Sequence, residues 1–234
     1  MVDLLKKVDK NIKQVSPAYF RFLLQIRTVE EDLRELGRLE VFPSRSKQLL
    51  EQLGLKTCFC GDYLLFSKKE KTIKEAKESL NSSENSEWTN RKLGNLFGYP
   101  DCCIEHFNKN IDLMIAEEDL RLKIKTISKH TSGKISWLLN NFTYFSFTIH
   151  HNCSYNCEKS IEKAKKYSHL INKFSKKTHK KAEEKSKGVL VVDEVGNKST
   201  FFKKYKKENG KIFIGRGGQK EIPENENLKT YIFN

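Results

Sequence analysis

This 234-residue chain contains two pairs of cysteines whose residue type and spacing suit a chemical function. Cys102 and Cys103 are adjacent, and Cys153 and Cys157 are separated by three residues. Thiolates bind soft metal ions and take part in redox reactions. Four of them suit a structural Zn²⁺ or an iron–sulfur cluster. The two pairs therefore predict one shared metal or thiol centre, although they do not specify a reaction.

The first pair is expected at the start of a helix. Pro100 has a fixed φ and no N–H, which suits the first turn of a helix. Cys102 and Cys103 would then lie among the unpaired amide donors of that helix. These donors and the helix dipole favour the thiolate form of both side chains.

The second pair is expected to repeat this arrangement. Asn152 or Ser154 can cap a helix in which Cys153 and Cys157 stand at positions i and i+4. Residues at that spacing lie on one helix face, about one turn apart. Two facing helix starts would bring up to four thiolates together.

The donor set leaves several ligand arrangements open. The spacing is not that of two CxxC zinc knuckles, and we favour an iron–sulfur cluster over Zn²⁺ as the cofactor. Adjacent cysteines point in different directions on a helix, so one of Cys102 and Cys103 can bind while the other stays free. His150 and His151, just before the second pair, are alternative ligands.

Other residues are weaker candidates for the site. Cys58 and Cys60 alternate on a predicted strand and so share one face, where they suit either an auxiliary thiol pair or core packing. No catalytic acid or base can be assigned. Glu105 and His106 flank the first pair and are expected at the surface.

Periodicity predicts an α+β fold with a mainly helical centre. We expect three regions: an N-terminal helical and small α/β region over 1–90, a helical cysteine-cluster domain over 91–187, and a small antiparallel β region over 188–234. In the first region, helices to about residue 40 break at Ser16-Pro17, and a hairpin turns at Gly61-Asp62. Residues 81–90 are expected to form a loop. One long basic helix is expected after Cys157, and three strands form a meander in the tail.

The formal charge of +14 and the sequence pI near 9.4 suit a nucleic-acid partner. Residues 159–187 hold eleven lysines and three glutamates, so RNA is the partner expected there. A composition bias is the alternative, because only eight of the 44 basic residues are arginines, which suit bidentate phosphate contacts better. No stretch is long and apolar enough to span a membrane, and a cytoplasmic location would keep the cysteines reduced. The sequence does not predict an oligomeric state.

Two segments carry a family resemblance. Residues 93–107, LGNLFGYPDCCIEHF, and 150–160, HHNCSYNCEKS, resemble a mostly archaeal, uncharacterised family known as domain of unknown function 483. Its pattern is GYPxCCxxxF followed about fifty residues later by HxxCxxxCxxS. The matching positions are Gly98, Tyr99, Pro100, Cys102, Cys103 and Phe107, then His150 or His151, Cys153, Cys157 and Ser160. Asn152 stands where relatives commonly have proline. The resemblance implies an archaeal cytosolic protein whose clusters act as one unit, and it transfers no activity.

Three hypotheses follow. The first is a cysteine-ligated metal centre, with an iron–sulfur cluster favoured, for redox or sulfur-transfer chemistry on RNA. The second is a non-catalytic nucleic-acid-binding protein held by structural zinc. The third is a metal-free redox protein in which Cys102 and Cys103 form a reactive vicinal pair.

Overall fold

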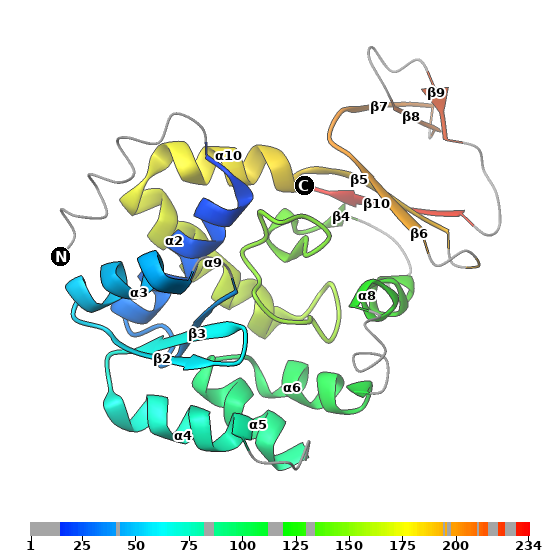
Figure 1. Ribbon diagram of the computed structural model, residues 1–234. Helices are drawn as coiled ribbons and strands as arrows, with labels where there is room; N and C mark the ends of the chain where they lie inside the picture. The colour runs from blue at the N-terminus through cyan, green and yellow to red at the C-terminus, as the bar shows by residue number, and fades with distance from the viewer. Residues whose placement is uncertain are drawn as a thin grey trace. The chain divides into compact units, whose positions relative to one another are not determined.

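A computed structural model describes residues 15–40, 43–81, 87–111, 119–129, 134–193, 195, 198–209, 211–214, 220–222 and 228–234 (Figure 1). Helices predominate in this part of the chain, together with three small sheets, so the predicted α+β class is confirmed. The residues group into two units, 1–108 with 169–178, and 109–168 with 179–234. The three-region division predicted from the sequence stays a prediction. In the described residues, no helix combines the length and apolar character needed to cross a membrane.

The first unit is built on the three-stranded sheet β1-β3-β2. Its elements are α2 (Pro17–Glu30), β1 (Gly37–Leu39), α3 (Pro43–Gln52), β2 (Lys56–Cys60), β3 (Tyr63–Ser67), α4 (Glu70–Asn81), α5 (Glu87–Leu96) and α6 (Asp101–Asn108). Leu64 and Phe66 of β3 pack with residues of α2 and α3, whereas Leu65 packs with residues of α4 and Phe97. Because side chains alternate along a strand, one short sheet supports a core on each face.

The start of α2 follows the sequence prediction, but its end does not. The Tyr19 N–H donates to the Ser16 side chain, with Pro17 in the first turn. The helix ends at Glu30. Asp32, two residues later, has a left-handed φ of 55°, and the Leu33 N–H donates to the Thr28 carbonyl. The predicted helix over this stretch is therefore wrong beyond Glu30. An aspartate at the left-handed position gives a weaker stop signal than glycine.

Strand β1 follows this turn and pairs antiparallel with β3. Gly37 stands opposite Phe66, and a Cβ at Gly37 would lie 2.1 Å from the Phe66 ring. Three residues are too few to show an alternating pattern, so the sequence did not indicate this strand. The predicted helix before Ser16 lies outside the described residues.

The second unit contains two sheets and several helices. Its elements are α8 (Asp119–Ser128), β4 (Lys134–Ile135), the 3₁₀ helix η1 (Trp137–Leu139), β5 (Gly188–Asp193), β6 (Lys198–Phe202), β7 (Tyr205–Glu208), β8 (Lys211–Ile214), β9 (Lys220–Glu221) and β10 (Leu228–Phe233). The strand orders are β4-β10-β5-β6 and β7-β8-β9. The pairs are antiparallel apart from β10 with β4. The predicted C-terminal meander is confirmed, with more strands than the three expected.

The observed helix boundaries correct two further predictions, those of the basic helix after Cys157 and of the loop over 81–90. The long basic helix after Cys157 is in fact two, α9 (Glu158–Phe174) and α10 (Lys176–Ser186). Ser175 separates them: its N–H donates to the Ile171 carbonyl, and its hydroxyl accepts from the Thr178 N–H. It therefore ends one helix and caps the next without a glycine or proline to mark the break. The predicted loop over 81–90 is also wrong at its ends, because α4 includes Asn81 and α5 begins at Glu87.

Candidate metal centre

The turn before the first cysteine pair is fixed by Gly98. Its φ is 67°, its N–H donates to the Asn95 carbonyl, and the Tyr99 N–H donates to the Gly94 carbonyl. These two bonds form a Schellman motif, which ends α5 with glycine in the left-handed conformation. The turn also fits closely against the 33–34 segment, since a Cβ at Gly98 would lie 3.3 Å from the Leu33 carbonyl oxygen.

Pro100 then starts α6. Its carbonyl accepts the N–H groups of Cys103 at 2.8 Å and Ile104 at 3.0 Å, so Pro100 occupies the N-cap position. Cys102 and Cys103 lie in the first turn of α6, as the sequence predicts. Cys103 is buried, and Cys102 is half-buried. The GYPxCC pattern thus encodes a helix end, a tight turn and a helix start that presents two thiols.

The second pair is not arranged as predicted. Helix α9 begins at Glu158, so Cys153 and Cys157 do not share a face of a helix. Instead the Cys157 N–H donates to the Ser154 carbonyl across a turn, and the Cys157 carbonyl accepts the Ile161 N–H as the first bond of the helix. Cys157 is therefore the N-cap of α9, and Cys153 lies in the preceding loop.

Burial of Tyr155 explains this correction. Its side chain is 2% exposed, its hydroxyl donates to the Asn141 side-chain oxygen, and its ring packs edge-on against Phe233. A turn between Cys153 and Cys157 places this large side chain in the core of the second unit. The hydrophobic gain outweighs the local tendency to extend the helix.

Two further bonds hold the same loop. The His150 Nε2 and Ser160 Oγ atoms are 2.9 Å apart, which ties the segment before the cysteines to the first turn of α9. The Asn152 side-chain amide donates to the Leu139 carbonyl at 3.2 Å. Ser160 and Asn152 are buried. Sequence reasoning did not identify Tyr155 or Asn141, and the only signal for Ser160 was its place in the family pattern.

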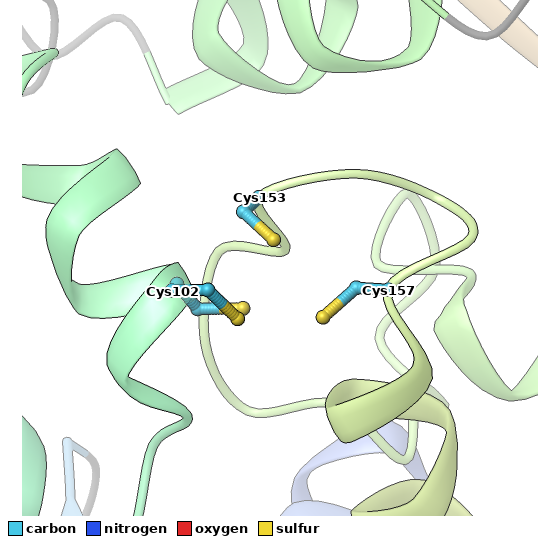
Figure 2. A group of neighbouring side chains, drawn as sticks. Cys102, Cys153 and Cys157 are labelled. Atoms are coloured by element: carbon cyan, nitrogen blue, oxygen red, sulfur yellow. The ribbon is translucent and has the colours of Figure 1, made fainter.

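The four thiols form one group. Their sulfur atoms, one each from Cys102, Cys103, Cys153 and Cys157, all lie within 4.8 Å of one another. Figure 2 shows the side chains of Cys102, Cys153 and Cys157 directed toward a common point, from a helix start, a loop and the residue before a helix. Cys157 is buried like Cys103, whereas Cys153 is half-buried like Cys102. Four thiols at this separation can hold a metal ion.

The other predicted residues are not members of this group. His150 and His151 do not belong to the set of neighbouring ligand atoms found among the described residues, and their ligation stays a prediction. Glu105 forms an exposed ion pair with Arg91 at 3.5 Å, which agrees with its expected surface position.

Cys58 and Cys60 also lie outside the group, and they pack against the core formed with Leu65 of β3. Burial raises the pKa of the Cys60 thiol, and the neighbouring Cys58 raises it further. The Cys60 thiol therefore favours the protonated form, unlike a metal-binding or nucleophilic cysteine.

Comparison with protein families gives one match. The model of the family described as Protein of unknown function (DUF483) matches residues 62–190, which include both cysteine pairs and the turns that hold them. Searches of curated proteins and of solved structures gave no match.

Proposed function

The chain belongs to the family described as Protein of unknown function (DUF483), and we propose that it is a metalloprotein whose four clustered cysteines bind one metal ion. The observation that carries this proposal is the mutual proximity of the four sulfur atoms. Four uncoordinated thiols have little reason to gather, because a thiol is a weak hydrogen-bonding group. Metal coordination gives such a group a function.

The separation of the sulfurs favours a single ion. A tetrahedral Zn²⁺ site with Zn–S bonds of about 2.3 Å has sulfur atoms about 3.8 Å apart. The sulfurs here lie within 4.8 Å of one another, which is compatible with that geometry. In a four-iron cluster each thiolate binds a different iron, which requires the sulfurs to spread apart.

A site with four thiolates favours a structural role. Catalytic zinc sites keep one position for water or substrate, whereas sites with four cysteine ligands are closed. Cys103 and Cys157 are buried, which further restricts access to the ion. The ion would supply binding free energy that holds the two cysteine segments in place.

The other hypotheses make different predictions for the same thiols. An iron–sulfur cluster, favoured by the sequence, remains the second candidate because the donor set is Cys₄ and two of the thiols are half-buried. In the metal-free hypothesis, Cys102 and Cys103 form a reactive vicinal pair. A reducing cytoplasm, the location we propose, is compatible with each of the three because all six cysteines are free thiols.

Metal analysis of anaerobically purified protein tests the proposal. We expect one metal ion per chain and, by X-ray absorption, four sulfur neighbours at about 2.3 Å if the ion is zinc. Cys157→Ser should lose the ion. Cys60→Ser is the matched control, because Cys60 lies outside the group, and this variant should keep full metal content.

Each outcome separates the candidates. One zinc and a colourless protein support the structural site, and one iron without inorganic sulfide supports the same geometry with a different ion. A brown protein that releases sulfide on acidification supports the iron–sulfur cluster and overturns the single-ion proposal. Absence of metal together with rapid alkylation of Cys102 supports the metal-free dithiol.

A further inference from the structure

The C-terminal end of α10 is covered by the 140–145 segment. The Asn140 amide donates to the Ser186 carbonyl at 2.7 Å, and the Ser186 hydroxyl donates to the Phe145 carbonyl at 3.1 Å. The Thr143 and Ser186 hydroxyl oxygens are 3.4 Å apart. These bonds hold the intervening Tyr144 near the end of α10 while its side chain remains 74% exposed. A large aromatic ring is thus presented to solvent by an anchored loop.

A lysine from a different element lies at the same helix end. Lys203 follows β6, and its Cα would lie 3.1 Å from a Cβ placed on Gly188, the first residue of β5. Gly188 lies two residues after Ser186, the last residue of α10, so this close approach places Lys203 at the end of the helix that carries Lys181 and Lys185. Three lysines, two from α10 and one from the residue after β6, therefore converge on the helix end that the 140–145 segment covers.

This convergence opposes folding. Lys181 and Lys185 stand at i and i+4 on α10, a spacing at which like charges are destabilising. Contact with the Lys185 side chain, burial and the charges of Lys185 and Lys181 together lower the pKa of Lys203 to about 8. A bound anion would relieve the repulsion, because it places negative charge between the ammonium groups.

We propose that Lys181, Lys185, Lys203 and Tyr144 form a binding surface for single-stranded nucleic acid. The lysines contact backbone phosphates, and the Tyr144 ring stacks on a base. The surface lies within the second unit, so the proposal does not depend on the metal centre.

The exposed ring distinguishes this ligand from other anions. A basic surface alone binds inorganic phosphate or an acidic lipid surface equally well. Single-stranded nucleic acid uses both features, because every base has a face that stacks on an aromatic side chain while lysines follow the backbone. The net charge of +14 adds a long-range attraction for a polyanion.

Fluorescence anisotropy with labelled 20-nucleotide oligo(U) and oligo(dT), measured over a series of salt concentrations, tests the proposal. Lys185→Gln with Lys203→Gln removes two phosphate contacts, so the slope of log K against log salt should fall by about 1.4. The matched control is Lys74→Gln with Lys129→Gln, which removes the same charge from other exposed positions and should leave the slope nearly unchanged.

Tyr144 is tested separately. Tyr144→Ala should weaken binding about fivefold or more without changing the salt slope, because stacking is not a counterion effect. Tyr144→Phe keeps the ring and should bind like the unchanged protein. Equal RNA and DNA affinity supports recognition through backbone and base alone, and a preference for one supports an added sugar contact.

Three results would overturn the proposal. The first is an equal loss of slope in the control variant, which would indicate that net charge alone drives binding. The second is no effect of Tyr144→Ala. The third is binding to phosphatidylserine vesicles that the lysine variants abolish while oligonucleotide binding persists, which would assign the surface to a membrane.

Discussion

Gly98 links the fold of the first unit to the thiol site, and its replacement by alanine has a calculable effect. The residue has a φ of 67°, which costs an L-amino acid about 1–2 kcal/mol. The new methyl group would also lie 3.2 Å from the Arg34 Cβ and 3.3 Å from the Leu33 carbonyl oxygen. These contacts are shorter than the optimal separation of about 3.5–4.0 Å, so they add to the backbone term. We expect Gly98→Ala to lower the free energy of unfolding by about 2 kcal/mol.

Gly61 offers a control in the same unit. It has a similar left-handed φ of 54° in the β2–β3 hairpin, but an added Cβ would meet no atom within 4 Å. Gly61→Ala therefore carries the backbone cost alone, about 1–2 kcal/mol. The difference between the two variants measures the contacts with the 33–34 segment.

Urea unfolding followed by circular dichroism measures stability, and competition with a chromogenic chelator measures metal affinity. Because Gly98 directs the start of α6, Gly98→Ala should also weaken metal binding, whereas Gly61→Ala should not. The reasoning fails if Gly98→Ala changes stability by less than about 0.5 kcal/mol, since any left-handed alanine should cost more. It also fails if both variants lower metal affinity equally, because the turn would then have no specific role.

Four further outcomes are expected. Lys203 has a folded pKa of about 8, below that of an ordinary lysine. Oligonucleotide affinity, measured by anisotropy, should therefore fall as pH rises through about 8. Lys203→Arg should abolish this pH dependence, because arginine stays charged. For the same reason stability should rise with pH between about 8 and the ordinary lysine pKa near 10.4, because the unfolded chain binds more protons there; thermal melts over this range check the sign. Tyr155→Phe leaves the Asn141 oxygen without its donor and should cost about 1–3 kcal/mol in urea unfolding, with weaker chelator-measured metal affinity. Because Cys58 contributes to the raised pKa of Cys60, Cys58→Ser should speed alkylation of Cys60 by iodoacetamide at pH 8, and an unchanged rate would show that burial alone sets the pKa.

The sequence alone correctly predicted helix starts and a hairpin turn. Ser16-Pro17 predicts the start of α2, and Gly61-Asp62 predicts the hairpin, because each involves interactions within a few residues. Pro100 likewise predicts that Cys102 and Cys103 lie at a helix start. The cysteines themselves indicated a shared site, since thiol chemistry depends on residue type.

Where the sequence prediction failed, a non-local contact or a weak local signal was responsible. Asp32 ends α2 in a conformation for which glycine is the usual sign, and Ser175 divides α9 from α10 with no glycine or proline. Strand β1 exists because β3 supplies its hydrogen bonds, a partner that lies more than twenty residues away.

The second cysteine pair shows most clearly what the sequence determines and what the tertiary structure determines. The spacing of Cys153 and Cys157 is compatible with one helix face, and sequence alone offered no reason to reject it. The structure has a turn there instead, which buries the Tyr155 ring and lets its hydroxyl donate to Asn141. The sequence by itself determined which four thiols are available and how Cys102 and Cys103 are presented. Only the tertiary structure decided that the sulfurs lie within 4.8 Å of one another, because that separation depends on segments about fifty residues apart in the chain.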